Sequence, residues 1–132
     1  MLDRVHHIGI AVHDIDMALA LYRDKLGCKT GLRRKLPDRK IEVQFLELPG
    51  AHLELLAPLS DDSPISRFLE KRGEGMHHIT YEVRDIEAAL AQLKADGVEA
   101  IDAEPRAGAE GKRVAFLHPK SMGGVLVELQ EA

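Results

Sequence analysis

Two histidines and two glutamates occupy matching places in two copies of one sequence pattern. His7 and His78 are 71 positions apart, and each is followed by a later apolar run that contains one acid, Glu54 or Glu128. Imidazole nitrogens and carboxylate oxygens form a mixed ligand set that suits divalent Zn, Ni, Co, Mn or Fe, and the absence of thiolates argues against a closed structural zinc centre. Because a duplicated module can bring two residues of each type together at its pseudo-twofold axis, the pattern predicts a metal site.

This ligand set favours one class of reaction. Four protein ligands in an octahedral field leave two positions open, where a substrate could chelate through two neighbouring oxygens. The metal would then act as a Lewis acid and stabilise an enolate formed next to a carbonyl. We therefore expect proton abstraction beside a carbonyl, and not the oxygen activation that a site of two histidines and one carboxylate supports.

Taken singly, each of these residues has an ordinary structural explanation. A lone histidine on a strand is usually hydrogen-bonded or partly exposed, and Glu54 alone could be a charge at a sheet edge. A carboxylate flanked by leucines or valines is, however, expensive to bury without a cation. Glu54 lies between Leu53 and Leu55, and Glu128 lies between Val127 and Leu129. Two such carboxylates in register with two histidines favour the metal site.

The pattern leaves open which histidines are the ligands. His6 precedes His7 and His77 precedes His78, and neighbouring side chains on a strand point to opposite faces. At most one member of each pair can therefore bind the ion. Three more histidines lie elsewhere in the chain, at His13, His52 and His118.

The elements that must position these residues follow the same order in each half. Side-chain types at residues 5–12 alternate with period two, which predicts a strand with His7 on its small-residue face. The apolar residues that come next recur at helical spacing, which predicts a helix. Residues 41–46 and 52–56 predict a hairpin around Pro49-Gly50. In the second half, a strand over 76–83 precedes a helix over 86–96. Strands over 113–117 and 125–130 then form the closing hairpin.

We predict an α+β fold of two tandem βαβββ modules that form a metal-binding cleft. A single ferredoxin-like sheet would also fit the mixed pattern, but the duplicated unit and the two late hairpins favour paired modules. The single domain covers residues 1–132, with module one at about 3–58, a connector at about 59–74 and module two at about 75–132. A short helix opens in the connector at Pro64.

Composition excludes several classes of protein. The net charge of −4 and the pI of about 6.0 argue against nucleic-acid binding. No apolar run approaches the roughly 20 residues that a membrane span needs. The first residues lead directly into a strand pattern without the features of a signal peptide, so we expect a cytoplasmic protein. The single cysteine, Cys28, cannot form an internal disulfide.

Longer segments resemble a known family. They read HHIGIAV at 6–12, LELLAP at 53–58, DSPI at 62–65, GEGMHHI at 73–79, FLHPKS at 116–121 and GVLVEL at 124–129. Together they cover nearly the whole chain. They resemble the vicinal oxygen chelate (glyoxalase/bleomycin resistance/dioxygenase) superfamily and, within it, the methylmalonyl-CoA epimerases. Glyoxalases of the superfamily usually carry a PDG-type turn before the last ligand strand, whereas this chain reads PKSMGG at 119–124, which favours the epimerases.

Carried over residue by residue, the resemblance implies four metal ligands, His7, Glu54, His78 and Glu128. The second histidine of each pair is then the ligand. The resemblance also implies one divalent metal ion per chain, for which we expect Co²⁺, with Zn²⁺, Ni²⁺ or Mn²⁺ as alternatives. Some epimerases have glutamine at the position of Glu54.

The reaction of the family inverts the carbon between a thioester and a carboxylate, and two carboxylates could serve it as acid and base on opposite faces. We expect Glu128 as one catalytic residue and Glu42 as the second. The PEQG segment of the family reads PDRK at residues 37–40, and some bacterial members place a catalytic glutamate at the position of Val43. Glu42 would point to the other face of the strand unless the strand carries a bulge.

Two further features have both a functional and a structural interpretation. Lys120 and Ser121 could bind the carboxylate of the substrate or could mark only a tight turn. The basic residues at 33–35 and 39–40 could contact an anionic ligand or could form a solvated strand edge.

The resemblance thus implies a metal-dependent epimerase, an isomerase that interconverts the enantiomers of methylmalonyl-CoA through a metal-stabilised enolate. We expect an acyl-CoA substrate and a homodimer, because the family is usually dimeric and paired modules expose sheet edges. Two alternatives stay open. One is a lactoylglutathione lyase, which would use the same metal site on a glutathione hemithioacetal, and the other is a non-catalytic small-molecule binding protein of the same fold.

Overall fold

The structure is a computed structural model that describes all of residues 1–132. The chain divides into two compact units. We call residues His7–His77 the N-terminal unit, and Met1–His6 with His78–Ala132 the C-terminal unit. None of the helices is long and apolar enough to cross a membrane.

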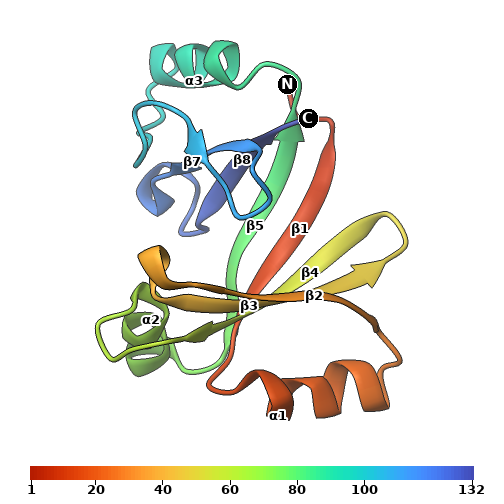
Figure 1. The fold of residues 1–132 in the computed structure, drawn as a ribbon. Coiled ribbons are helices and arrows are strands. Elements are labelled where there is room, and N and C mark those ends of the chain that lie inside the picture. The colour runs from red at the N-terminus through yellow and green to blue at the C-terminus, as the bar shows by residue number, and fades with distance from the viewer. The chain divides into compact units, whose positions relative to one another are not determined.

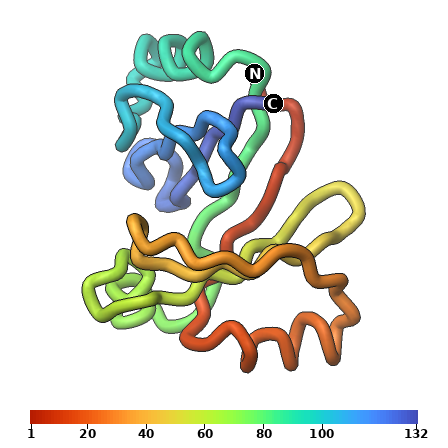
Figure 2. Tube along the Cα trace, viewed as in Figure 1, coloured from red at the N-terminus to blue at the C-terminus, as the bar shows by residue number.

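The N-terminal unit contains four neighbouring strands that pair with one another (Figure 1). Its strand order is β2-β3-β4-β1. In chain order the strands are β1 (Arg4–Ala11), β2 (Lys29–Leu36), β3 (Ile41–Leu48) and β4 (Ala51–Pro58). Strand β1 runs parallel to β4, whereas β2 and β3 pair antiparallel with their neighbours. The tight turn between β3 and β4 is the yellow loop of Figure 2, where Gly50 adopts a φ of 85° that suits glycine.

The C-terminal unit repeats this topology. Its strand order is β5-β8-β7-β6, with β5 parallel to β8 and antiparallel pairing between the others. In chain order the strands are β5 (Gly75–Val83), β6 (Arg106–Ala107), β7 (Arg113–Leu117) and β8 (Val127–Glu131). The matching strand orders confirm the predicted α+β fold of two βαβββ modules. Strand β8 begins two residues later than predicted, after the positive φ angles of Gly123 and Gly124.

Each helix begins at a polar capping residue. Asp14 accepts a hydrogen bond from Met17 N at the start of α1 (Ile15–Leu19), which continues as the π-helical turn η1 (Ala20–Lys25). Asp85 caps α3 (Ile86–Ala95) in the same way. The connector forms α2 (Pro64–Arg72), where Ser63 is the cap and Pro64 takes the first helical position as predicted. Two short 3₁₀ turns complete the chain: η2 (Pro37–Arg39) and η3 (Pro119–Ser121).

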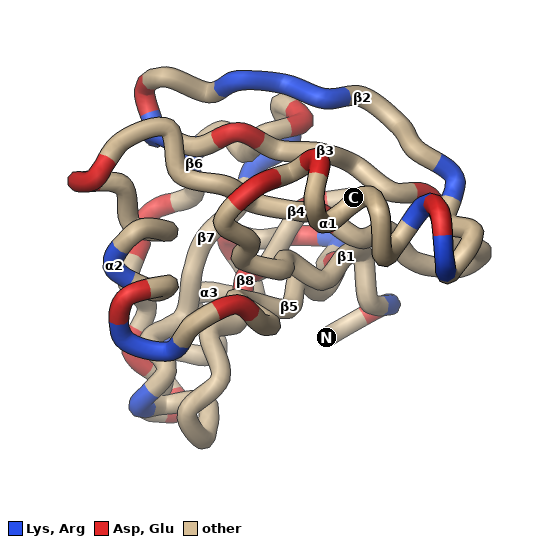
Figure 3. The backbone as a smooth tube through the Cα atoms, turned by 90° about the horizontal axis from the view of Figure 1, so that it is seen from below, with Lys and Arg blue, Asp and Glu red and all other residues tan.

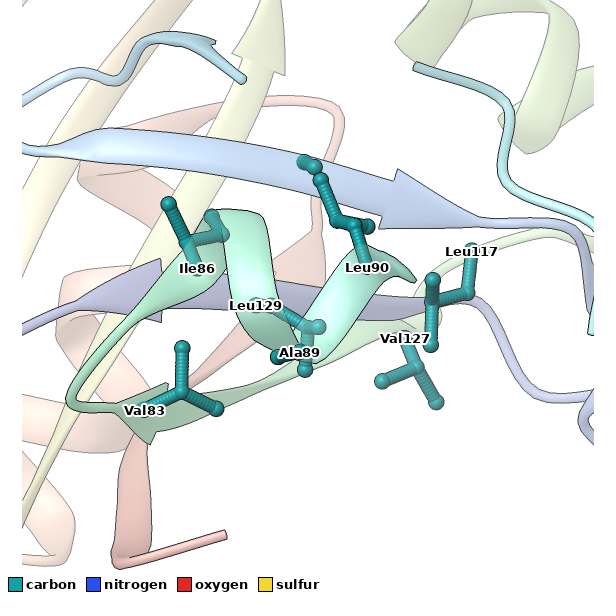
Figure 4. Close-up of a cluster of buried hydrophobic side chains, with 8 residues drawn as sticks. Val83, Ile86, Ala89, Leu90, Leu117, Val127 and Leu129 are labelled. Atoms are coloured by element: carbon teal, nitrogen blue, oxygen red, sulfur yellow. The ribbon is translucent and has the colours of Figure 1, made fainter. Parts of the chain in front are cut away.

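Helices α1 and α3 each bury one face of the strands in their unit. In the C-terminal unit, Ile86, Ala89 and Leu90 of α3 pack on residues of β5, β7 and β8, including Leu117 and Leu129 (Figure 4). In the N-terminal unit, α1 covers one sheet face, where its Ile15 and Leu19 pack with Leu46 and Leu55. Because side chains alternate along a strand, Glu54 and Glu128, each next to such a core leucine, point away from the α1 core and the α3 core respectively.

The basic stretch at residues 33–35 lies on β2, the edge strand of the N-terminal sheet, as the strand-edge interpretation predicts. Figure 3 shows the Lys and Arg positions in blue along this strand. The pairing of β2 with β3 shifts between Thr30 and Arg33. The side-chain amide of Gln44 donates to the carbonyls of Gly31 and Leu32 within this irregular stretch, at 3.1 and 3.3 Å. The Gln44 side chain therefore satisfies backbone carbonyls of β2 in the stretch where the strand pairing shifts.

Candidate metal centre

The N-terminal unit contains a buried imidazole–carboxylate pair. The parallel register of β1 and β4 sets Gly9 beside Glu54. His7 is two positions from Gly9 and therefore lies on the same sheet face. Its Nε2 atom is 3.0 Å from Oε2 of Glu54. Only 4% of His7 and 5% of Glu54 is exposed.

The C-terminal unit contains a second pair at the matching places. The parallel register of β5 and β8 sets Thr80 beside Glu128, and His78 lies two positions before Thr80 on the same face. His78 Nε2 is 3.8 Å from Glu128 Oε1, and both residues are buried. The Thr80 hydroxyl donates a hydrogen bond of 2.7 Å to the same carboxylate oxygen. The Phe116 and His78 rings pack in a T-shaped arrangement, with the ring centroids 5.7 Å apart.

These residues fit a divalent metal ion by their chemistry. His7, His78 and Glu128 are all buried and offer the nitrogen and carboxylate oxygen atoms that hold such ions. A buried carboxylate needs hydrogen bonds or a cation to offset its lost hydration. Glu54 has the same character, since it is buried beside an imidazole within its own unit. The donor set contains no thiolate and therefore suits an open site rather than a closed structural one.

The first histidine of each pair has other partners. His6 is buried, with Nε2 3.1 Å from the side-chain nitrogen of Gln130 and 3.9 Å from the Glu110 carboxylate. The rings of His77 and Phe68 pack in a T-shaped arrangement, with the ring centroids 5.0 Å apart. Burial, together with the nearby charge of Arg72, lowers the pKa of His77.

The remaining histidines lie outside these two pairs. His13 is exposed, and its backbone N donates to Glu74. His52 is half-buried on β4, where the strand register sets it beside His7 of β1. His118 caps η3 by accepting a hydrogen bond from Lys120 N at its Nδ1 atom. Among the seven histidines, those that lie beside Glu54 and Glu128 are the second members of the two sequence pairs.

The structure does not bring Glu42 to the sheet face of His7 and Glu54. The pairing of β3 with β4 runs without a shift from Ile41 to Leu48, so β3 carries no bulge against β4. Phe45 lies opposite Glu54 and shares its face, whereas Glu42 is three positions away and lies on the other face.

On that other face, Glu42 belongs to a chain of charges. Its carboxylate accepts a hydrogen bond of 3.2 Å from Arg33 Nε, and Arg33 also donates to Asp16 of α1 at 2.7 Å. The two carboxylates raise the pKa of the Arg33 guanidinium through these hydrogen bonds. Val43, which shares the face of Glu54, is buried in the apolar cluster beside α2.

Lys120 and Ser121 lie on η3 in the C-terminal unit. The Ser121 hydroxyl accepts a hydrogen bond of 3.0 Å from Glu99 N, which connects the turn to the segment after α3. Lys120 is exposed. The hydrogen bond supports the interpretation of Ser121 as a turn residue. The ammonium group of Lys120 is accessible to solvent.

Sequence reasoning did not single out Thr80, although it contacts Glu128 directly. One signal in the repeat could have indicated it. Thr80 lies 71 positions after Gly9, the same spacing as His78 after His7. A hydroxyl therefore stands in one copy where the other copy has no side chain.

Residues 6–116 match the model of the Glyoxalase/Bleomycin resistance protein/Dioxygenase superfamily. The chain is 47% identical to the ethylmalonyl-CoA/methylmalonyl-CoA epimerase of Cereibacter sphaeroides, and the match covers 99% of both chains. It is 46% identical to the mitochondrial methylmalonyl-CoA epimerase of Homo sapiens, over 99% of this chain and 75% of the human one.

A solved structure has the same fold. It is a variant of Streptomyces coelicolor methylmalonyl-CoA epimerase in complex with 2-nitronate-propionyl-CoA, and it is 36% identical to this chain. The TM-score is 0.93, and the comparison covers 100% of this chain and 96% of the other. The similarity therefore extends over both units of the fold.

Proposed function

The chain belongs to the glyoxalase/bleomycin resistance protein/dioxygenase superfamily, and from this premise we propose that it is an epimerase that interconverts the enantiomers of methylmalonyl-CoA. The observation that carries the proposal is the nearly full-length similarity to epimerases of this substrate. The two buried histidine–glutamate pairs support it, because the chemistry of such an epimerase is proton transfer next to a carbonyl.

The proposal assigns one divalent metal ion to each chain. His7, Glu54, His78 and Glu128 would hold it, with Co²⁺ as the expected ion and Zn²⁺, Ni²⁺ or Mn²⁺ as alternatives. When bound, such an ion supplies Lewis-acid polarisation of the substrate oxygens next to the reacting carbon. Each unit contains one buried imidazole and one buried carboxylate, and these donor types support this assignment.

Glu128 is the residue to which we assign proton transfer at the substrate carbon. Its carboxylate is buried, which strengthens its electrostatic interactions with a bound substrate. The hydrogen bond from Thr80 holds one of its oxygens, which limits the rotation of the carboxylate. A base whose position is restricted in this way needs little reorganisation when the proton moves.

The exposed Lys120 is proposed to bind the carboxylate of the substrate. An ammonium group on a flexible stem is a suitable partner for this anion. The role proposed for Ser121 is to hold the turn that carries Lys120, because its hydroxyl already accepts a hydrogen bond from Glu99 N. Glu42 has no role at the reacting carbon in this proposal, because it lies on the α1 face with Arg33.

We also propose that the protein is a homodimer. Strand β2 lies at the edge of the sheet in the N-terminal unit. Apolar side chains are exposed on this strand and on α1. They include Leu32 and Met17, which are 70% and 75% exposed. An exposed strand edge with apolar neighbours is a common site of association. Light scattering coupled to size-exclusion chromatography would give the mass of the assembly directly.

The activity is tested by proton exchange. We would incubate one enantiomer of methylmalonyl-CoA with the protein in D₂O, with and without chelator, and follow the α-proton by NMR. Chelator-sensitive deuterium incorporation that accompanies inversion is the expected result. Turnover of a methylglyoxal–glutathione mixture, without inversion of methylmalonyl-CoA, would instead identify a lactoylglutathione lyase.

A further inference from the structure

The two copies of the module differ at the residue that faces the buried carboxylate. The register of β1 with β4 sets Gly9 beside Glu54, and the register of β5 with β8 sets Thr80 beside Glu128. Glycine has no side chain to offer, whereas threonine brings a hydroxyl. The duplicated sites are therefore chemically unequal at this one neighbouring position.

The geometry of the two pairs differs in the corresponding way. In the N-terminal unit, Glu54 approaches the His7 imidazole to 3.0 Å, which is a normal hydrogen-bond distance. In the C-terminal unit, the Thr80 hydroxyl lies 2.7 Å from Glu128 Oε1, and the His78 imidazole is 3.8 Å from the same oxygen. The second distance is too long for a hydrogen bond. The carboxylate is therefore bonded to the hydroxyl and stands off from the imidazole.

Thr80 is well suited to hold the carboxylate in one orientation. Its side chain is completely buried, and the branched Cβ of threonine restricts rotation about χ1. A hydroxyl that donates to a carboxylate at this distance forms a charge-assisted hydrogen bond, which is stronger than a neutral one. The contact therefore restricts the orientation of Glu128. Gly9 has no side chain and cannot restrict Glu54 in this way.

We propose that Thr80 is a positioning residue that fixes the orientation of the Glu128 carboxylate for metal binding and proton transfer. The inference rests on the proposed function and extends it, because it explains why the two equivalent glutamates have different roles. Without the hydroxyl, Glu128 should turn towards His78 and form the closer pair that Glu54 forms with His7. Both residues would then be less available to the metal and to the substrate.

The test compares variants that keep or remove the hydroxyl. Thr80→Val removes the hydroxyl but preserves the shape of the side chain. Thr80→Ser retains the hydroxyl. The chain has one other threonine, Thr30, which is exposed on β2, so Thr30→Val is the matched control. Thermal unfolding establishes that each variant is folded, and Thr80→Ala is measured in place of Thr80→Val should that variant fail to fold.

Three measurements follow on the folded variants: cobalt affinity by competition with a chelator, kcat and KM for epimerisation, and a crystal structure without metal. Thr80→Val should lower cobalt affinity or kcat by about 10–100-fold, as is typical when a residue that orients a ligand is removed. The effect on KM should be small. Thr80→Ser and Thr30→Val should stay within about threefold of the original protein. In the structure of Thr80→Val, the distance between His78 and Glu128 should fall from 3.8 Å towards 3.0 Å.

Two results would overturn the inference. One is a Thr80→Val variant that keeps its cobalt affinity, its kcat and the separation of His78 from Glu128. The other is an equal loss in Thr80→Ser and Thr80→Val, which would mean that the hydroxyl alone does not position Glu128, because Thr80→Ser retains it.

The outcome is separable from that of the proposed function. A protein that fails to epimerise methylmalonyl-CoA contradicts the proposed activity. Cobalt affinity and the metal-free structure would still decide whether Thr80 positions Glu128.

Discussion

His7 Nε2 lies 3.0 Å from Glu54 Oε2, so a buried imidazole and a buried carboxylate form a direct pair inside the N-terminal unit. The two residues are far apart in the sequence and come together because β1 and β4 are parallel neighbours. The C-terminal unit repeats the arrangement with β5 and β8. Both halves of the duplicated chain therefore carry the same two donor types on equivalent strands.

We predict about one divalent transition metal ion per chain in protein purified without chelator, because the buried imidazoles and carboxylates form a ligand set for such an ion. Elemental analysis by mass spectrometry checks this. His7→Ala and His78→Ala should each lower the metal content by about tenfold or more, whereas His13→Ala, which changes an exposed histidine, should leave it unchanged. A metal-free protein that also fails to bind added cobalt would contradict the proposed metal and would favour a binding protein without catalysis.

The two glutamates proposed as metal ligands should respond differently to the same substitution. Glu54→Gln should keep most of the activity, because an amide oxygen can still bind a metal ion. Glu128→Gln should lower kcat by about 10²–10⁴-fold, because it removes a group that transfers protons as well as a ligand. Steady-state kinetics and metal analysis of both variants test this. Equal losses of activity with the metal retained in both would show that Glu128 has no special role.

Glu42→Gln should leave kcat within about threefold of the original value. Glu42 lies on the α1 face of β3, where its partner is Arg33, and we expect no direct part for it in proton transfer. The loss of a half-exposed ion pair should lower the free energy of unfolding by no more than about 1 kcal/mol. Kinetics and urea denaturation measure the two effects. A folded variant with a loss in kcat greater than about 100-fold would restore Glu42 as the second acid or base.

The ion pair between Lys40 and Asp62 should make the stability of the folded protein depend on pH in the acidic range. The hydrogen bond from Lys40, with a second from Ser60, lowers the pKa of Asp62 to about 2. Because the folded-state pKa is below the unfolded one, the contribution is present above about pH 4 and is lost as the pH falls towards 2. Asp62→Asn should therefore lower Tm at pH 6 but have little effect at pH 2.

The neighbouring exposed Asp61 supplies the control for this prediction. Asp61→Asn removes the same charge from the same loop without the contact to Lys40. It should shift Tm less than Asp62→Asn at pH 6. A Tm difference between Asp62→Asn and the original protein that is constant from pH 6 to pH 2 would contradict the assignment.

The architecture of this protein follows from local patterns in its amino-acid sequence. Period-two alternation at residues 5–12 and 76–83 predicted β1 and β5, and helical spacing after Asp14 and Asp85 predicted α1 and α3. These are local patterns that depend on the few residues of each element. The repeat then showed that the two halves share one plan, which the matching strand orders confirm.

The residues that surround each carboxylate follow from the packing of distant segments and not from local patterns. The partners of His6 and His7, the unshifted pairing of β3 with β4 at Glu42 and the contact of Thr80 with Glu128 all depend on the register between strands. Register joins residues that are distant in sequence, and a shift of one position moves every side chain to the opposite face. Local patterns contain no information on such a shift, whereas the packing of whole sheets against their helices selects one register.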